Sequence, residues 1–128
     1  MGGGNQCVTD LTAARAIFAP LAHAPREVAA FAYLDRAHRV IALRYTPAGS
    51  VAAITLPIRT VAREALVFDA AGLLMAHNHP SNDARPSAAD IDVTRRFERA
   101  LAALDLKLID HLILTPSGVA SFRELGLL

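Results

Sequence analysis

Two histidines separated by one residue, His77 and His79, carry the clearest chemical signal in this sequence. Residues i and i+2 of an extended segment project to the same face, so both imidazole rings can point at one metal ion. Asp90 lies further along the chain and can add a carboxylate ligand. Three protein ligands with an open fourth position are typical of a catalytic zinc site. Histidines beside a polar loop are also common surface residues, and the spacing alone leaves both interpretations open.

Ser87 and Asp90 have a structural interpretation as well as a chemical one. The pattern Ser-x-x-Asp after Pro86 predicts a helix N-cap at Ser87 with an acidic residue in the first turn. The two interpretations do not exclude each other, because side chains of a helix point back toward its N-terminus. The loop that carries the histidines arrives from that side. We therefore expect the start of this helix to hold Asp90 in place as the third ligand.

A hydrolytic metal site also needs a group that accepts a proton from the attacking water. Binding to zinc lowers the pKa of water to about 7, and a nearby carboxylate can then take its proton. Glu27 is the candidate, because it directly precedes a strongly apolar segment. By spacing alone, however, a solvated residue at the end of a strand is the better interpretation of Glu27.

The first half of the chain is predicted to form a helix followed by antiparallel strands. Thr9 or Asp10 can cap a helix that runs through about residue 22. The almost continuous apolar run over residues 27–34 suits a central strand buried on both faces. The chain is then expected to return antiparallel over residues 39–44, and a third strand is expected over residues 51–56.

The second half is predicted to place the histidine loop between a strand and a helix. A helix is expected from about residue 58, and a short buried strand over residues 73–76 runs directly into His77. Another helix begins at Ser87 and is followed by strands over residues 106–114 and 119–122. The core stripe of that helix is predicted to contain Ile91, Thr94, Phe97, Leu101 and Leu104.

Helices and strands interleave, so the predicted fold class is α/β with a mixed sheet. The chain has 128 residues, of which 53% are hydrophobic, and it is expected to form one domain over residues 9–128 after a flexible lead over residues 1–8. The net charge of +1 gives no overall basic field and argues against nucleic acid as the main partner.

The composition indicates in which compartment the protein is expected and whether it is expected to contact a membrane. Cys7 is the single cysteine, so no intramolecular disulfide can form, and a reducing compartment is natural. The glycine-rich start lacks the apolar core of a secretory signal. No run approaches the roughly 18 apolar residues of a membrane span. We therefore expect a cytoplasmic protein without a membrane partner.

The residues together resemble the motif of the JAMM (MPN+, JAB) metalloproteases: an upstream Glu, then His-x-His, seven residues and Ser-x-x-Asp. Within that group the chain is most similar to the bacterial RadC family, over residues from about 9 to 124. The strings that carry this similarity are His77-Asn78-His79-Pro80-Ser81, Pro86-Ser87-Ala88-Ala89-Asp90-Ile91, Val93-Thr94-Arg95-Arg96, Leu108-Ile109-Asp110-His111-Leu112-Ile113 and Ser121-Phe122-Arg123-Glu124. Upstream, Glu27 with Phe31 and Leu34-Asp35 looks like the glutamate-containing first strand of the family.

The resemblance implies a fold, a cofactor and a role for each site residue. The fold would be the three-layer JAMM/MPN type, related to that of cytidine deaminases, with helices on both sides of a mixed central sheet. One Zn²⁺ ion would be held by His77, His79 and Asp90, with water as the fourth ligand. Glu27 would act as the general acid and base, and Ser87 would help to stabilise the tetrahedral intermediate.

Two departures from the RadC pattern stand out. RadC proteins usually have glycine after His-Asn-His-Pro-Ser, and this chain has Asn82. Asparagine tolerates left-handed backbone angles nearly as well as glycine, so we expect the loop to keep its shape. Full-length RadC proteins also carry a helix-hairpin-helix-like region before the JAMM domain. This sequence begins too late to contain one, and we interpret it as a stand-alone RadC-like protein or an excised domain.

Three classes of function follow. The first is a zinc-dependent peptidase or isopeptidase, whose peptide or protein substrate the sequence does not name. The alternative is a DNA repair or recombination accessory without peptidase activity, for which the basic cluster Arg95, Arg96 and Arg99 is the support, although such clusters are usually a solvated helix face. A non-catalytic scaffold is the third, and the complete ligand set argues against it. Exposed sheet edges would allow a dimer, and the oligomeric state stays open.

Asp110 and His111 interrupt an otherwise apolar strand. The favoured interpretation is a partly buried polar pair whose hydrogen bonds are satisfied locally. The other is that one of them orients a ligand histidine from behind.

Overall fold

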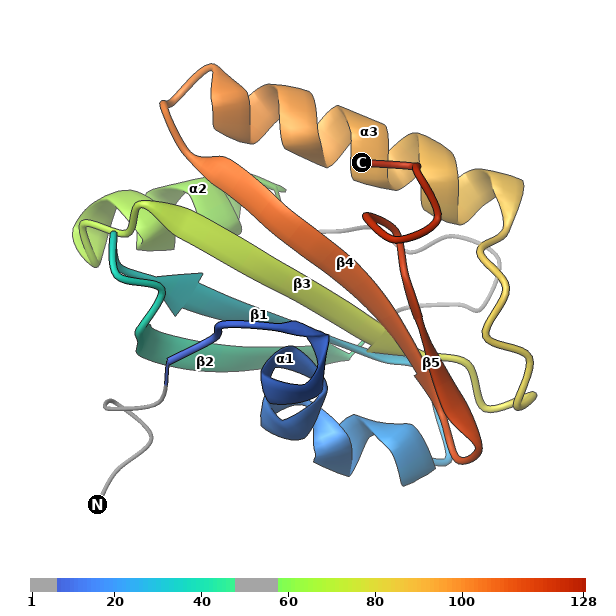
Figure 1. Ribbon diagram of the computed structural model, residues 1–128. Coiled ribbons are helices and arrows are strands. Elements are labelled where there is room, and N and C mark those ends of the chain that lie inside the picture. The colour runs from blue at the N-terminus through green and yellow to red at the C-terminus, as the bar shows by residue number, and fades with distance from the viewer. Residues whose placement is uncertain (1–6, 48–57) are drawn as a thin grey trace.

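A five-stranded sheet lies at the centre of the protein in a computed structural model that describes residues 7–47 and 58–128 (Figure 1). In chain order the elements are α1 (Leu11–Ile17), the 3-10 helix η2 (Ala19–His23), β1 (Val28–Leu34), β2 (Val40–Pro47), α2 (Ile58–Val67), β3 (Gly72–Asn78), α3 (Ala88–Ala102), β4 (Lys107–Thr115) and β5 (Gly118–Ser121). The strand order is β2-β1-β3-β4-β5. Strands β3 and β4 are parallel and the other neighbours are antiparallel. This confirms the predicted α/β class with a mixed sheet.

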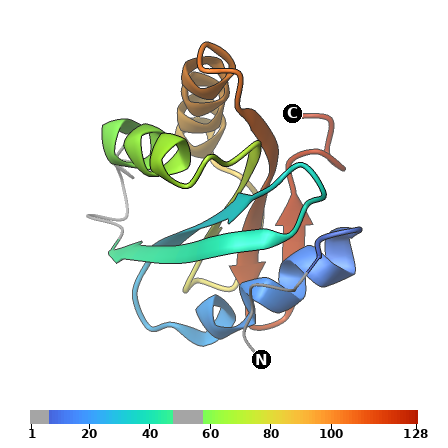
Figure 2. The same ribbon diagram turned by 90° about the vertical axis from the view of Figure 1, so that its left-hand side faces the viewer.

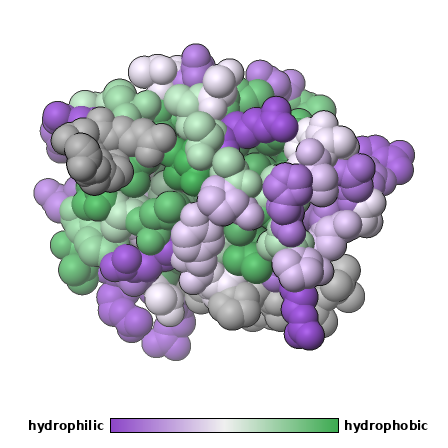
Figure 3. Space-filling view, turned by 90° about the horizontal axis from the view of Figure 1, so that it is seen from below, coloured by the Kyte–Doolittle hydropathy of each residue, from purple (hydrophilic) through white to green (hydrophobic). Residues whose placement is uncertain are grey.

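Helices cover both faces of the sheet, which gives the three layers that the resemblance implies (Figures 1 and 2). Alternate residues of β1 enter two separate cores. Ala30 and Ala32 pack in the core under α1 and η2, whereas Phe31 and Tyr33 pack in the core under α2 and α3. A strand buried on both faces reads as a continuous apolar run, so the prediction for β1 is confirmed. On the α1 side, hydrophobic and hydrophilic residues share the outer surface (Figure 3).

The N-terminal helix differs from its prediction. Its N-cap is confirmed, because the Asp10 side chain accepts a hydrogen bond from the Ala13 N–H. The single helix expected through about residue 22 is wrong, since α1 ends at Ile17 and the chain continues as the 3-10 helix η2. Pro20 accounts for the break, because a proline inside an α-helix has no N–H to donate and clashes with the preceding turn.

Strands β1 and β2 form the predicted antiparallel hairpin. The Asp35 carboxylate closes the turn by accepting hydrogen bonds from the N–H groups of Ala37 and Arg39. Strand β2 then runs to Pro47, beyond the expected range, because every residue of β1 finds a partner up to the pair Val28 and Pro47. The strand predicted over residues 51–56 lies outside the described residues.

Helix α3 begins where the sequence indicates and buries a slightly different stripe. Ser87 is its N-cap, and the predicted core positions Thr94, Phe97 and Leu101 are fully buried. Leu104 is not a core residue, because the helix ends at Ala102 and Leu104 is 40% exposed in the turn that follows. The arginines predicted on the outer face are exposed, namely Arg95, Arg96 and Arg99.

The connection from β3 through α3 to the parallel strand β4 determines where a site can form. In sheets of this kind, ligands bind outside the carboxyl ends of the strands. The loop after β3 and the N-terminus of α3 meet at that edge (Figure 1). The residues of the sequence motif are therefore carried to one end of the sheet.

The N-terminal residues that are described contact the domain. Cys7 pairs with Arg39 in an isolated β-bridge, and the buried Val8 donates its N–H to the carbonyl of His38. These two residues belong to the predicted lead, whose first six residues lie outside the described part. Among the described residues, no helix combines the length and apolarity that crossing a bilayer requires.

Candidate metal centre

His77, His79 and Asp90 converge at the carboxyl end of β3. Each offers one ligand atom, and these atoms lie within 4.8 Å of one another. The Nε2 atoms of His77 and His79 are 3.0 Å apart. The Asp90 oxygens lie 3.4 Å from the Nε2 of His77 and 3.3 Å from the Nε2 of His79. The fold thus brings both imidazole rings to one point, as the spacing of the two histidines predicts.

Asp90 is held by the capping box at the start of α3. Its Oδ2 accepts a hydrogen bond from the Ser87 N–H at 2.8 Å, and its own N–H donates to the Ser87 Oγ at 3.0 Å. Burial raises the pKa of the Asp90 carboxyl, but the contacts with the His77 and His79 rings and the hydrogen bond from the Ser87 N–H outweigh burial and hold that pKa well below its usual range. Asp90 is therefore ionised, and it serves as a cap and as a neighbour of both histidines at once.

The loop after β3 fixes the ring of His79. Its Nδ1 lies 2.7 Å from the carbonyl oxygen of Asp83. A carbonyl only accepts, so Nδ1 carries the hydrogen, and in the neutral ring the lone pair is left on Nε2, facing Asp90. Asp90 raises the pKa of His79, because its carboxylate can accept a hydrogen bond from the protonated ring, and partial burial lowers it.

Asn82 gives the loop its shape. Its φ is +68°, which is the left-handed conformation that we expected asparagine to adopt in place of the family's glycine. Its Oδ1 also accepts hydrogen bonds from the N–H and the hydroxyl of Ser117, in the turn between β4 and β5. The departure at this position therefore keeps the left-handed turn and ties the loop to a neighbouring hairpin.

His77 is completely buried, and its ring has partners on both nitrogens. Its Nε2 faces His79 and Asp90, while its Nδ1 lies 2.7 Å from the Nε2 of His111 on β4. Burial lowers the pKa of His111 well below its usual value, so that ring is neutral. Both ring nitrogens of His111 and the carboxylate of Asp110 have hydrogen-bond partners, as the favoured interpretation expects, and the contact with His77 is the one that the other interpretation expects.

The donor set fits a divalent metal ion. Two ligands at zinc distances of about 2.0–2.1 Å in a tetrahedron are separated by about 3.3 Å. The Nε2 atoms of the two histidines are 3.0 Å apart, and each has one Asp90 oxygen nearby, Oδ1 at 3.4 Å from His77 and Oδ2 at 3.3 Å from His79. Two imidazole nitrogens and a carboxylate also match the ligand chemistry of zinc. These residues can hold a metal, and the donor set alone does not fix which one.

Glu27 stands beside this group, as the sequence motif requires. It lies just before β1, two residues ahead of Ala29, which pairs with His77 across the sheet. Its side chain is buried, and burial raises the pKa of its carboxyl, which the nearby His77 and His79 partly offset. The solvated strand-end interpretation of Glu27 therefore does not apply.

Asn78, the residue between the two histidines, holds the segment that carries Glu27. Its Oδ1 accepts from the Val28 N–H at 2.7 Å, and its amide group donates to the carbonyls of Ala24 and Arg26 at 3.1 and 3.0 Å. The sequence reasoning missed this role. The available signal was a polar side chain at the end of an apolar strand, on the face opposite to the histidines.

The comparison with known families agrees with this geometry. The family model of the RadC-like JAB domain matches residues 8–127. The chain belongs to the RadC family. Relatives include a UPF0758 protein of Acidithiobacillus ferrooxidans, 46% identical over 101 residues, and one of Burkholderia mallei, 44% identical over 102 residues. A third, from Marinomonas sp., is 41% identical over 107 residues.

These RadC relatives are longer than the chain. The matches cover 79%, 80% and 84% of this chain but 45%, 37% and 48% of the three relatives. The chain therefore spans less than half the length of the curated relatives that it matches. Their names state no activity.

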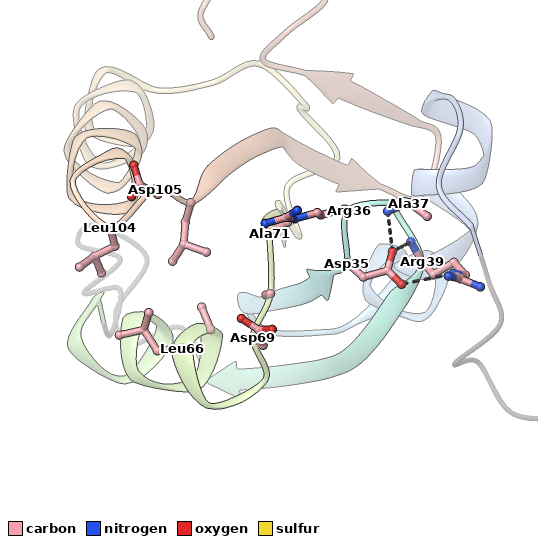
Figure 4. A pocket seen from close by; sticks show the side chains of 12 residues that line it. Asp35, Arg36, Ala37, Arg39, Leu66, Asp69, Ala71, Leu104 and Asp105 are labelled. Atoms are coloured by element: carbon pink, nitrogen blue, oxygen red, sulfur yellow. Dashed lines mark hydrogen bonds and ion pairs between the residues drawn. The ribbon is translucent and has the colours of Figure 1, made fainter.

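A cavity of about 580 Å³ opens at the opposite end of the sheet (Figure 4). Its lining includes Asp35, Asp69 and Asp105 with Arg36 and Arg39. In the part of the chain that the structure describes, the group of possible metal ligands is the one formed by the two motif histidines and the motif aspartate. The candidate site is thus a largely buried polar cluster at one end of the sheet, away from this cavity.

Proposed function

We propose that the protein is a zinc-dependent hydrolase of peptide or isopeptide bonds, with His77, His79 and Asp90 as the metal ligands. The observation that supports this most directly is the convergence of three ligand atoms within 4.8 Å beside the buried carboxyl of Glu27. Zinc bound there would polarise the scissile carbonyl and lower the pKa of water to about 7. Membership of the RadC family, through a JAB domain model, supports the same reading.

Glu27 is proposed as the acid and base of the reaction. Its raised pKa brings the carboxyl closer to the range in which it can both accept and release a proton. It would accept a proton from the attacking water and pass it to the leaving amine nitrogen. Asn78 keeps the segment bearing Glu27 against the end of β3 through its three hydrogen bonds.

Ser87 is proposed to stabilise the oxyanion. In the capping box its Oγ accepts the hydrogen bond from Asp90 N–H, so the hydroxyl hydrogen is not used by the cap. Ser87 is exposed at the start of α3, next to a proposed ligand. That hydrogen is therefore free to donate to the oxygen of a tetrahedral intermediate.

The test compares the wild-type protein with the Glu27→Gln variant, both loaded with zinc. A library of peptides and ubiquitin-like isopeptide conjugates serves as the substrate. We expect hydrolysis by the wild type and a loss of at least ~100-fold in the variant, because a positioned acid or base contributes about that much or more. Zinc content should stay the same. Full zinc loading of the wild type without hydrolysis of any substrate would contradict the enzymatic part.

A DNA-binding role is the second candidate, and one observation favours it: Arg95, Arg96 and Arg99 are all exposed on α3. Contacts with phosphates would make binding fall steeply with salt. The measurement is duplex DNA affinity between low and near-physiological salt, for the wild type and for a variant with all three arginines changed to glutamine. Equal affinity of the two proteins would remove this candidate.

A further inference from the structure

We propose that His111 and Thr94 are positioning residues that set which nitrogen of His77 carries the hydrogen, so that the Nε2 lone pair of His77 faces the metal centre. This inference rests on the metal-binding part of the proposed function. It concerns a chain of hydrogen bonds that begins on α3, crosses to β4 and ends on β3, and each link fixes the direction of the next.

The first link is the hydroxyl of Thr94. It donates to the carbonyl oxygen of Asp90, one helical turn earlier, at 2.6 Å. A carbonyl oxygen has no hydrogen, so the single hydroxyl hydrogen of Thr94 is used in this bond. The same Oγ1 lies 2.6 Å from the Nδ1 of His111. With its hydrogen already engaged, Thr94 acts only as an acceptor toward His111.

The second link follows for His111. Its Nδ1 must carry the hydrogen that Thr94 accepts, and in a neutral imidazole the other nitrogen then has a lone pair. The Nε2 of His111 therefore accepts, and its partner at 2.7 Å is the Nδ1 of His77. His77 must then carry its hydrogen on Nδ1.

The last link is at the metal centre. With the hydrogen on Nδ1, the neutral ring of His77 has its lone pair on Nε2, the atom that faces His79 and Asp90. The opposite order of hydrogens would put an N–H in that position, which cannot ligate a cation. A histidine ligand normally donates its other N–H to an acceptor that fixes its tautomer and orientation. Here that acceptor is a third histidine.

The structure around His111 holds its ring in this position. The ring stacks on Phe122, with centroids 4.4 Å apart and planes 17° apart. The carbonyl of His111 accepts from the Phe122 N–H, and the Asp110 side chain accepts from the N–H groups of His111 and Arg123. Two of the strings that carry the RadC resemblance, around Asp110-His111 and Phe122-Arg123, thus hold the ring of His111 in place. We call the hydrogen-bonded chain from Thr94 through His111 to His77 the relay.

The direct test is the ring tautomer of His111 in the metal-free wild-type protein. Long-range proton–nitrogen NMR spectra distinguish protonated from unprotonated ring nitrogens. We expect His111 to be protonated at Nδ1 and bare at Nε2, with Nδ1 of His77 protonated. A His111 ring protonated at Nε2 and bare at Nδ1 would overturn the proposal. This measurement requires no variant, so a folding defect cannot obscure it.

Variants of both relay residues give a second readout, the affinity for zinc measured by competition with a chelator. His111→Phe keeps a ring against Phe122 but removes the acceptor, and His111→Gln keeps an acceptor near the position of Nε2. We expect zinc affinity to fall by about 10–100-fold in the first variant and to be largely retained in the second. Thr94→Val and Thr94→Ser form a matched pair with the same expectation. Equal affinities within each pair would overturn the proposal.

Failure of this inference is distinguishable from failure of the proposed function. Wild-type zinc binding and hydrolysis together with the wrong tautomer of His111 would remove the relay and leave the hydrolase. The expected tautomers with no peptide hydrolysis would leave the relay and remove the hydrolase.

Discussion

The two ends of the central sheet both carry acidic side chains next to strand termini, but only one end directs them at a common point. At the histidine end, Asp90 is buried and faces two imidazole rings. At the other end, Asp35 closes its own turn, while Asp69 and Asp105 have positive φ values of 54° and 58° in turns and are exposed (Figure 4). Aspartate in those turns is explained by local backbone requirements.

The difference between these ends shows what turns a carboxylate into a ligand candidate. Asp90 has a local role too, as part of the capping box of α3. What distinguishes it is that the parallel crossover from β3 to β4 places that cap against the end of β3. The cavity at the opposite end has volume but no imidazole among its lining residues. Convergence of donor atoms, rather than the size of a hollow, identifies the candidate site.

Removing one ligand should have the largest effect. His79→Ala deletes a half-buried ring in the loop after β3, so the fold should survive while zinc affinity falls by more than the ~10–100-fold that follows loss of an outer partner. Zinc content per chain, measured by emission spectrometry after dialysis, checks this. The control is Asp105→Asn at the opposite end, a residue type that keeps the left-handed turn. Equal loss of zinc from the two variants would contradict the assignment of the metal to the histidine end of the sheet.

The second-largest effect is expected from deleting the side-chain amide of Asn78. Asn78→Ala leaves one backbone N–H and two carbonyls without their partner, and we expect the free energy of unfolding to fall by about 2–4 kcal/mol, since each unsatisfied buried group costs about 1–3 kcal/mol. Denaturant titration of the metal-free protein measures it. Hydrolysis should also decrease, because Glu27 loses its support, while zinc affinity changes little.

A second asparagine, Asn82 in the loop that follows β3, offers the control for Asn78. Asn82→Gly removes two exposed hydrogen bonds with Ser117 and keeps a residue that adopts positive φ readily. Its stability should stay close to that of the wild type. A loss of unfolding free energy as large as that of Asn78→Ala would mean that the hydrogen bonds of Asn78 stabilise the fold no more than the exposed ones of Asn82.

A smaller loss of stability than that of Asn78→Ala is expected for a variant away from the histidines. Tyr33→Phe removes the hydrogen bond from the buried tyrosine hydroxyl to Glu64, and stability should fall by about 0.5–1.5 kcal/mol. Zinc affinity should be unchanged. Thermal unfolding and a zinc competition assay check the two statements. A change in zinc affinity at this distance would show that the two ends of the sheet are not independent.

The sequence was sufficient for the elements with strong local patterns. The apolar run of β1, the Asp10 cap and the Ser87 cap are all local features, and each is confirmed. Leu104 was misplaced because apolar spacing does not show where a helix ends. The interruption at Pro20 was missed because the apolar stripe continues through the 3-10 turn, where Leu21 is still buried.

In the candidate site, too, some residues follow from a local pattern in the sequence and others do not. His77, His79 and Asp90 were predicted because a short motif contains them. The roles of Asn78, Thr94 and His111 depend on register between strands that are distant in the sequence, and no spacing rule reports that. Glu27 is a candidate from its place before an apolar run, although spacing alone favours a solvated residue there, and the family resemblance strengthens its assignment. The pairing of Ala29 with His77 supplies the physical reason for its position.

A crystal structure of the zinc-soaked protein, with anomalous scattering at the zinc edge, tests the central claim most directly. We expect one zinc ion per chain, with the Nε2 atoms of His77 and His79 at about 2.0–2.1 Å and an Asp90 oxygen as the third protein ligand. An anomalous peak elsewhere with these three side chains unliganded, or no bound zinc at saturating concentration, would contradict it.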